Sequence, residues 1–368
     1  MDAPLLFISA GDPSGDNAVS RVVQCLRQKR PGLRVFGLGG PRLRQLGQEQ
    51  LAEPSALAVL GFWEVARKYL FFRKLFYDCV NEIRQRRPKA ILLVDYPGFN
   101  LRLARAIRPL GIPIIYYISP QVWAWGKGRL GLIRDCVDRM LVILPFEEAF
   151  YREHGIACKF VGHYLLEDIP PTYVSSAAPG GKQIALLPGS RRQEVERILP
   201  LMLDAASALC RSHGMTAAVA AMSGTYDYDS ICKGYVSSGV KVIYDDPRRV
   251  MYESDIVLTA SGTATLEAGI IGRPMVVVYR TGSMTYLIAR NLVKLDKIAL
   301  VNLVLDDKVV PELIQNEANS RRMVEETEKY LLDDECRLSV TRSLARVPSL
   351  LGGLGASAHA AEAIGEYL

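Results

Sequence analysis

The sequence contains no apolar run long enough to cross a membrane. Its uninterrupted apolar runs, such as Ala90–Val94 and Met275–Val278, are short, whereas a membrane-spanning helix needs about 20 predominantly apolar residues. A secretory signal is also missing, because Met1-Asp2-Ala3-Pro4 carries no positive charge ahead of the apolar run Leu5–Ile8. We therefore expect a cytosolic chain that does not cross a membrane.

Cysteine and histidine are few and scattered. The seven cysteines include no C-x-x-C pair, and the four histidines form no H-E-x-x-H motif. Zinc sites and disulfide frameworks bring such residues together at short spacings, so we expect reduced thiols, no metal site and no cofactor. The dinucleotide fingerprint G-x-G-x-x-G is absent too, because Arg42 stands where Gly37-Leu38-Gly39-Gly40 would need a third glycine.

The composition is that of a globular protein. The chain has 368 residues, of which 49% are apolar and 23% are charged, which excludes a disordered chain and suggests two domains or three. Lys and Arg outnumber Asp and Glu by 45 to 39, giving a net charge of +6. This mild excess fits an anionic partner but is too dilute to indicate a nucleic acid.

Short apolar runs alternate with amphipathic segments through most of the chain. The predicted strands are residues 5–10, 34–38, 90–95, 113–118, 140–144, 183–187, 216–222, 241–244, 255–259 and 274–279. The predicted helices are residues 16–29, 64–86, 101–109, 127–137, 146–153 and 193–212. Near-continuous apolar strands between helices indicate parallel sheets covered on both faces. We therefore predict an α/β fold of two doubly wound Rossmann-like domains with ligands in an inter-domain cleft.

A stretch rich in Pro, Ser and Gly at residues 162–182 interrupts this alternation and is typical of a linker. We place the domain boundary there, so that residues 1–165 form the first domain and residues 166–340 the second. Residues 341–368 are predicted to be a helical segment that can pack back on the first domain.

Two turns in the first half follow predicted strands. Ser9-Ala10-Gly11-Asp12-Pro13-Ser14-Gly15-Asp16 leads into a helix that Ser14 or Asp16 can cap, and its free N–H groups suit an anion or sugar hydroxyls; a plain turn is the alternative. Asp95 ends another apolar strand, where its carboxylate can take a proton from a substrate hydroxyl. Its alternative role is to cap the next helix.

Aromatic residues are concentrated in two places. Trp123 and Trp125 lie in the loop Ser119-Pro120-Gln121-Val122-Trp123-Ala124-Trp125 and suit stacking on a sugar or an acyl chain, with packing between domains as the alternative. The segment Phe62–Tyr77 (FWEVARKYLFFRKLFY) is both aromatic and basic. At 100° per residue, one broad face holds Phe62, Val65, Ala66, Tyr69, Leu70, Phe72, Phe76 and Tyr77.

On that helical projection, Phe71 and Leu75 fall on the opposite, charged side, where a core helix needs no apolar residue. The pattern therefore indicates a helix in a membrane interface or beside an acyl chain, with core or oligomer packing as the alternative. The candidate acyl or membrane contacts are Phe62, Trp63, Tyr69, Phe72, Phe76, Trp123 and Trp125.

Two loops in the second half are suited to phosphate. Leu187-Pro188-Gly189-Ser190-Arg191-Arg192 joins a strand to a helix, and an Arg at a helix N-terminus can bind phosphate through two hydrogen bonds. Ser261-Gly262-Thr263-Ala264-Thr265-Leu266-Glu267 exposes small residues and N–H groups to a diphosphate, and Glu267 can reach ribose hydroxyls. An ordinary helix cap is the alternative for the second loop.

Together these motifs resemble the lipid-A-disaccharide synthase family, inverting glycosyltransferases of GT-B architecture. The matching segments are S-A-G-D-P-S-G-D (9–16), G-G-P-R (39–42), V-D-Y-P-G-F-N (94–100), S-P-Q-V-W-A-W (119–125), L-P-F-E-E-A-F-Y (144–151), F-V-G-H (160–163), L-L-P-G-S-R-x-x-E-V (186–195), A-S-G-T-A-T-L-E (260–267) and N-L (302–303). They run in family order along nearly the whole chain. S-P-Q-V-W-A-W together with P-F-E-x-x-F-Y is specific to this family.

The resemblance implies a transfer of 2,3-diacylglucosamine from UDP-2,3-diacylglucosamine to 2,3-diacylglucosamine 1-phosphate, which forms the β-1,6 lipid A disaccharide 1-phosphate and UDP. It also implies that Asp95 is the candidate general base. Asp12 is a second catalytic carboxylate, stands where the family usually has Glu, and is the alternative residue to take the proton. The implied UDP and diphosphate contacts are Gly189, Ser190, Arg191, Ser261, Gly262, Thr263, Thr265, Glu267 and Asn302.

The same resemblance implies that the first domain binds the acceptor and lipid while the second binds the UDP-sugar, without a metal. The enzyme would lie on the anionic cytoplasmic face of the inner membrane of a Gram-negative type envelope. A homodimer is a possible oligomeric state. One alternative is another GT-B enzyme acting on a UDP-amino sugar, a 2-epimerase or a peptidoglycan glycosyltransferase. Another is a non-catalytic protein that binds a nucleotide sugar or docks on a membrane.

Overall fold

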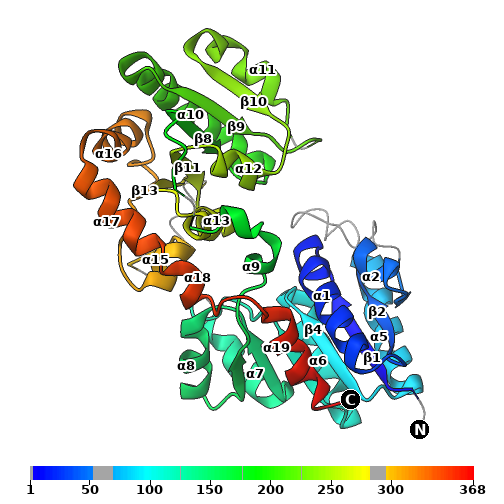
Figure 1. Ribbon diagram of the computed structural model, residues 1–368. Coiled ribbons are helices and arrows are strands. Elements are labelled where there is room, and N and C mark those ends of the chain that lie inside the picture. Colours follow the sequence, from blue (N-terminus) through cyan, green and yellow to red (C-terminus); the bar gives the residue numbers. More distant parts are fainter. Residues whose placement is uncertain (1–2, 53–68, 125, 176, 225, 282–295) are drawn as a thin grey trace. The chain divides into compact units, whose positions relative to one another are not determined.

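The computed structural model describes residues 3–52, 69–124, 126–175, 177–224, 226–281 and 296–368. The chain divides into two compact units, one of residues 1–164 and 352–368 and the other of residues 165–351 (Figure 1).

The first unit is built on a parallel sheet with the strand order β3-β2-β1-β4-β5-β6-β7. Its strands are β1 (Leu5–Ala10), β2 (Arg34–Leu38), β3 (Glu49–Gln50), β4 (Ala90–Val94), β5 (Ile114–Tyr117), β6 (Arg139–Val142) and β7 (Cys158–Phe160). Its α-helices are α1 (Pro13–Lys29), α2 (Pro41–Gln45), α5 (Tyr69–Arg86), α6 (Pro97–Ile107), α7 (Leu130–Cys136), α8 (Pro145–Glu153) and α19 (Ala356–Gly365). The last of these, α19, lies beside α1 (Figure 1).

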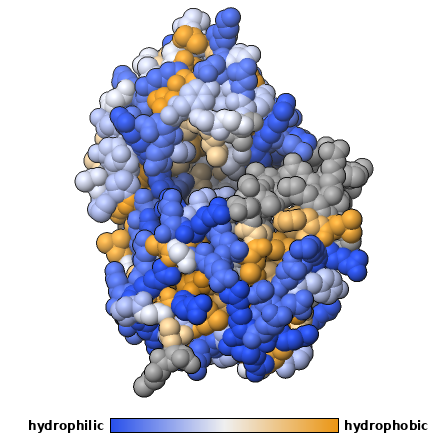
Figure 2. All heavy atoms as spheres, turned by 90° about the vertical axis from the view of Figure 1, so that its right-hand side faces the viewer, coloured by the Kyte–Doolittle hydropathy of each residue, from blue (hydrophilic) through white to orange (hydrophobic). Residues whose placement is uncertain are grey.

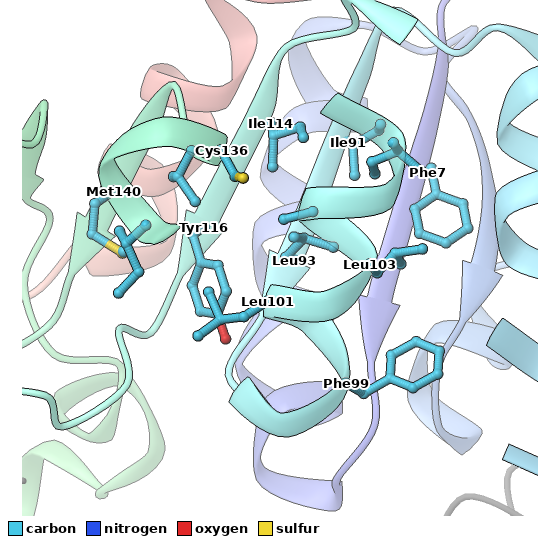
Figure 3. Close-up of a cluster of buried hydrophobic side chains, with 14 of the residues drawn as sticks. Phe7, Ile91, Leu93, Phe99, Leu101, Leu103, Ile114, Tyr116, Cys136 and Met140 are labelled. Atoms are coloured by element: carbon cyan, nitrogen blue, oxygen red, sulfur yellow. The ribbon is translucent and has the colours of Figure 1, made fainter. Parts of the chain in front are cut away.

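The strands of this sheet are continuous hydrophobic runs in the sequence because apolar residues are buried on both of its faces. All five residues of β4 are buried, as expected for a parallel strand covered by helices on both sides. Figure 3 shows side chains from β1, β4, β5 and α6 meeting in one cluster, among them Phe7, Leu93, Leu103 and Tyr116. This cluster fixes the position of the strand ends that carry the candidate site.

The second unit contains a second parallel sheet with the order β10-β9-β8-β11-β12-β13. Its strands are β8 (Gln183–Leu187), β9 (Thr216–Ala220), β10 (Val240–Ile243), β11 (Ile256–Ala260), β12 (Met275–Tyr279) and β13 (Glu312–Ile314). Its α-helices are α9 (Leu165–Asp168), α10 (Arg192–His213), α11 (Tyr228–Cys232), α12 (Pro247–Tyr252), α13 (Thr263–Ile271), α15 (Leu300–Leu305), α16 (Ser320–Leu332), α17 (Asp334–Leu344) and α18 (Val347–Leu350).

The direction of strand addition reverses once in each sheet. In the first unit the reversal lies between β1 and β4, and in the second it lies between β8 and β11. Helices that follow these adjacent strands leave toward opposite faces of the sheet, so the strand ends border a crevice in which ligands of doubly wound proteins bind. The loops after these four strands are the ones that the sequence analysis selected.

The predicted fold class is confirmed, and each of the ten predicted strands corresponds to an observed one. Three short strands, β3, β7 and β13, were not predicted, because two or three residues are too few to show an apolar run. The helix predicted at 101–109 begins earlier, at Pro97, since a proline suits the first turn of a helix. Among the described residues, no helix combines the length and the hydrophobicity that a membrane crossing requires.

The expected orientation of the aromatic segment is wrong for Leu75. Residues 62–68 lie outside the described part of the chain, and α5 begins at Tyr69. Leu75 is buried in the core of the first unit with Cys79 and Ile83, one and two helical turns further on. The projection stopped at residue 77 and therefore missed this buried stripe. Leu70 and Tyr77 on the opposite side are exposed.

Asp16 does not cap α1, which the sequence suggested as one possibility, but binds the N-terminus of α2. Its side chain is buried and accepts hydrogen bonds from the N–H groups of Gly40 (2.9 Å), Arg42 (3.0 Å) and Leu43 (3.2 Å), which are the N-terminal donors of α2. Asp12, rather than Ser14 or Asp16, caps α1. Asp16 therefore joins α1 to α2, and it is not available to a ligand.

Candidate active site

A buried amide joins the ends of the two central strands of the first unit. Asn100, in the first turn of α6, donates from Nδ2 to the carbonyl oxygens of Ser9 (3.3 Å), Val94 (3.0 Å) and Asp95 (2.8 Å). Its Oδ1 accepts from the hydroxyl of Ser9 at 2.6 Å. The hydroxyl of Tyr116 on β5 also donates to the Asp95 carbonyl, at 2.6 Å. These bonds hold the backbone of Asp95 at the reversal between β1 and β4.

Asp95 has an unusual backbone and a perturbed carboxyl group. Asp95 and Tyr96 have φ angles of 44° and 46°, a left-handed conformation that costs energy outside glycine and is found at functional sites. Burial and, to a lesser extent, the nearby charge of Asp12 together raise the pKa of Asp95 to about 6, while the hydrogen bond from the Tyr96 N–H opposes the shift. A carboxyl with this pKa is suited to accept a proton near neutral pH.

Asp12 lies at the neighbouring strand end and caps α1. Its Oδ2 accepts from the N–H of Gly15 at 3.4 Å and from the hydroxyl of Ser14. Its Oδ1 is buried and has no hydrogen-bond partner among the described residues. The helix cap orients this carboxylate, whose charge acts on Asp95, so the structure brings the two predicted catalytic residues together.

Glycine is required at the turn between β1 and Asp12. A Cβ atom on Gly11 would lie 2.6 Å from Cδ1 of Tyr96, so a larger residue would displace the aromatic ring. Tyr96 in turn stacks on Phe99, with 6.0 Å between ring centroids. The turn after β1 and the turn after β4 are thus packed directly against each other.

A buried carboxylate anchors the loop that carries Trp123. Oε1 of Glu147, at the start of α8, accepts from the hydroxyl of Ser119 (2.6 Å) and from the indole N–H of Trp123 (3.0 Å). Its Oε2 accepts from the N–H of Leu144 at 3.1 Å. Burial raises the pKa of Glu147 to about 7, although these donors oppose the shift. Trp123 is half-buried and fixed at both its ring and its N–H, since it also packs on Phe146.

The phosphate loop predicted in the second unit already holds an anionic group. Oε2 of Glu194 accepts from the N–H groups of Ser190 and Arg191, each at 3.3 Å, and its Oε1 binds the Arg191 guanidinium at 2.8 Å. Gly189 has a φ of 113°, and a Cβ there would lie 2.6 Å from the Glu194 carboxylate. The loop is therefore shaped around a carboxylate that binds the donors a phosphate would use.

The Ser261 loop offers fewer ligand groups than the sequence analysis expected. Gly262 and Thr263 are exposed at the N-terminus of α13. Thr265, in contrast, is fully buried, and both its N–H and its hydroxyl donate to the Gly262 carbonyl, at 3.1 and 2.8 Å. We therefore expect Thr265 to hold the first turn of α13 rather than to contact the diphosphate, because both of its donors bind the Gly262 carbonyl.

Glu267 lies one turn into α13 and forms an ion pair that the sequence analysis did not predict. Its Oε1 accepts from Nε of Arg248 on α12 at 2.8 Å. Only 14% of the Glu267 side chain is exposed, and burial raises its pKa even though Arg248 opposes the shift.

Asn302 is held by hydrogen bonds within the second unit. Its side chain is fully buried, donates to the Val310 carbonyl (2.9 Å) and to Oε1 of Glu312 (2.8 Å), and accepts from the Val310 N–H (3.1 Å). All of its polar atoms are therefore engaged within the protein. The amide fixes the segment that leads into β13. We therefore expect a structural role for Asn302 rather than a contact with UDP.

The remaining aromatic candidates are only partly described. Phe62, Trp63 and Trp125 lie outside the described residues. Phe72 is half-buried, and Phe76 packs against the core with its ring centroid 5.9 Å from that of Phe99. Within the described ranges no three His, Cys, Asp or Glu side chains gather as metal ligands, and the expectation of a metal-free site stays a prediction.

Four residues of the site were missed by sequence reasoning: Asn100, Glu147, Glu194 and Arg248. Glu147 and Glu194 occur three residues after the N-cap residues Leu144 and Arg191, the spacing of a capping box. Neither Asn100 nor Arg248 has such a spacing to its partners. Asn100 binds Ser9, 91 positions away, and the backbone of Val94 and Asp95. The partners of Arg248 lie 19 and 80 positions away.

Solved structures share this fold across the whole chain. The Acinetobacter baumannii MurG superposes with a TM-score of 0.63 at 14% identity, covering 98% of this chain and 99% of that one. The calicheamicin glycosyltransferase CalG4 gives 0.62 at 15% identity over 100% and 98% of the two chains. A UDP-GlcNAc 2-epimerase from Neisseria meningitidis gives 0.63 at 13% identity over both whole chains. The fold is therefore the GT-B fold of glycosyltransferases.

Sequence relatives define the class further. The family model of lipid-A-disaccharide synthetase matches residues 6–347. The lipid-A-disaccharide synthase of Myxococcus xanthus is 38% identical over 99% of this chain and 98% of its own length. That of Anaeromyxobacter dehalogenans (strain 2CP-C) is 41% identical over 98% and 96%. The chain belongs to the lipid-A-disaccharide synthase family, and it is a glycosyltransferase that uses a UDP-sugar donor and a sugar acceptor.

We predict that Asn302→Ala lowers the free energy of unfolding by about 3 kcal/mol, because Val310 and Glu312 lose buried hydrogen-bond partners. Urea denaturation measures this change, and the exposed Asn316→Ala is the matched control, expected within about 0.5 kcal/mol of the wild type. The affinity for UDP should stay within threefold at conditions where the variant is folded. A variant of unchanged stability that no longer binds UDP would show that the amide contacts the donor.

Proposed function

We propose that this glycosyltransferase transfers 2,3-diacylglucosamine from UDP-2,3-diacylglucosamine to the 6-hydroxyl of 2,3-diacylglucosamine 1-phosphate. The single observation that carries the proposed chemistry is the Asp95 carboxyl, held at the reversal of the first sheet with a pKa of about 6. The products are the β-1,6-linked disaccharide 1-phosphate and UDP.

In this mechanism Asp95 accepts the proton of the acceptor 6-hydroxyl as its oxygen attacks the anomeric carbon of the donor. The bond from that carbon to the diphosphate oxygen breaks, the electron pair leaves with UDP, and the configuration inverts. Asp12 keeps the pKa of Asp95 high enough to receive the proton. The first unit accordingly binds the acceptor and lipid in this proposal.

The donor binds to the second unit at the strand reversal between β8 and β11. The N–H groups of Ser190 and Arg191 and the Arg191 guanidinium bind the diphosphate, which takes over donors now bound by the Glu194 carboxylate. The exposed N-terminus of α13 at Gly262 and Thr263 adds the positive end of a helix dipole. Glu267 accepts from the ribose hydroxyls. These groups stabilise the charge that develops on the leaving UDP.

The acylated substrates reach the enzyme at an anionic membrane surface that it contacts without crossing. Leu70 and Phe71 at the start of α5 are 75% and 36% exposed, beside the basic residues Arg73 and Lys74. Figure 2 shows hydrophobic patches among hydrophilic side chains on one face of the molecule. Apolar and basic groups on one helix suit an interface of lipid headgroups and acyl chains. A UDP-sugar epimerase would need no such surface.

The assay uses the purified chain with UDP-2,3-diacylglucosamine and the 1-phosphate acceptor, and it measures disaccharide and UDP. We expect Asp95→Asn to lower kcat by about 100-fold or more, because general base catalysis is lost. The exposed Asp135→Asn, whose carboxylate contacts only Arg134 at 3.5 Å among the described residues, is the matched control and should keep wild-type activity. Full activity in Asp95→Asn would refute the base assignment.

The same residue sets the expected pH dependence. Asp95 acts only when ionised, so kcat/KM should rise with pH through about 6 and then level off. Asp12→Asn removes a negative charge that raises the Asp95 pKa, so the rising limb should move to lower pH. A limb that stays in place in Asp12→Asn would belong to another group, such as the acceptor phosphate.

Membrane contact is tested by sedimentation with vesicles of phosphatidylglycerol or of phosphatidylcholine. We expect binding to the anionic vesicles only, and about a tenfold loss in Leu70→Ser, because one exposed leucine no longer enters the lipid. Leu332→Ser on α16 is the matched control, since Leu332 is equally exposed, at 73%. Equal losses in both variants, or no binding by the wild type, would contradict the membrane contact through α5.

A further inference from the structure

Arg248 lies between two carboxylates inside the second unit. Its Nε donates to Oε1 of Glu267 at 2.8 Å, and another of its nitrogens lies 3.8 Å from Oδ2 of Asp168. It also donates to the Asp168 carbonyl at 3.2 Å. The exposed fractions of the three side chains are 21% for Arg248, 14% for Glu267 and 5% for Asp168. The guanidinium thus bridges α9 and α13 in a largely buried place.

The arrangement leaves one oxygen of Glu267 available. Arg248 binds Oε1, and in the described part of the chain Oε2 of Glu267 accepts no hydrogen bond. A planar guanidinium with several fixed donors can hold one carboxylate in a set direction while it binds a second partner. Lysine carries its N–H donors on one nitrogen at the end of a flexible chain, so it fixes the direction of a carboxylate less well.

Arg248 itself is fixed by its own turn. It is the second residue of α12, and its N–H donates to Oδ1 of Asp246 at 3.0 Å. Its neighbour Arg249 points elsewhere and pairs with Asp245 (3.0 Å) and Glu253 (2.9 Å), with 56% of its side chain exposed. Of these two adjacent arginines, only Arg248 is directed to the Glu267 carboxylate.

We infer that Arg248 is a positioning residue for donor binding: it holds Glu267 so that its second carboxylate oxygen faces the ribose hydroxyls of the UDP-sugar. The inference rests on the proposed role of Glu267 and extends it to a residue that touches no substrate. Because Asp168 is the last residue of α9, the same guanidinium ties the ribose-binding carboxylate to the segment with which the second unit begins.

The test compares two ligands that differ only in the ribose hydroxyls, UDP and 2′,3′-dideoxy-UDP, by titration calorimetry on the full chain. The wild type should bind UDP more tightly, and Glu267→Gln should lose most of that difference. We expect Arg248→Gln to weaken UDP binding about tenfold and dideoxy-UDP binding less than twofold. Arg249→Gln is the matched control and should bind both ligands as the wild type does.

Each outcome decides between separate ideas. If the wild type does not distinguish the two ligands, the proposed ribose contact of Glu267 fails, and the inference fails with it. If Glu267→Gln loses the discrimination while Arg248→Gln keeps it, the inference alone is wrong. Equal losses for both ligands in Arg248→Gln would mean a purely structural role. Arg248→Lys, which keeps the charge, provides a second folded variant and should lose most of the discrimination as well.

Discussion

Two neighbouring parallel strands end side by side at the point where the strand order of each sheet reverses. This arrangement determines where the loops of the candidate site lie. In the first unit, the Asn100 amide binds the backbone at the ends of both β1 and β4, so the turns that carry Asp12 and Asp95 cannot separate. In the second unit, the same arrangement of β8 and β11 brings the Arg191 and Gly262 loops together. Each unit thus uses one topological feature to assemble its part of the chemistry.

Several loops around these strand ends are held in place by carboxylates that accept hydrogen bonds. Asp16 joins α1 to α2, Glu147 fixes the loop that carries Trp123, and Glu194 fills the phosphate loop. A carboxylate that accepts several N–H groups shapes a loop without needing a large core around it. Many motif residues therefore hold loops in place, and the substrate contacts that we propose involve a smaller number, chiefly Asp95, Arg191 and Glu267.

The sequence predicted the fold well because apolar runs and helical periodicity are local signals, and parallel strands of five residues show them clearly. It also selected turns that follow the strands at the two reversals, since a polar residue directly after a buried strand lies at the carboxyl end of that strand. It could not distinguish residues that touch a ligand from residues that hold the loop. Asn302 and Thr265 have the right chemistry for UDP, but their partners, Val310, Glu312 and the Gly262 carbonyl, already engage them. Arg248 reaches partners 19 and 80 positions away, so no local pattern reveals it.

The strand reversal holds the Asp95 carboxyl in a poorly solvated place beside Asp12, where we propose that it acts as a base. Carbon-13 NMR of the labelled Asp95 carboxyl, assigned by its absence in Asp95→Asn, measures this directly as the pH is varied. We expect a titration midpoint of about 6. A midpoint near 4, the ordinary value for an aspartate, would contradict it.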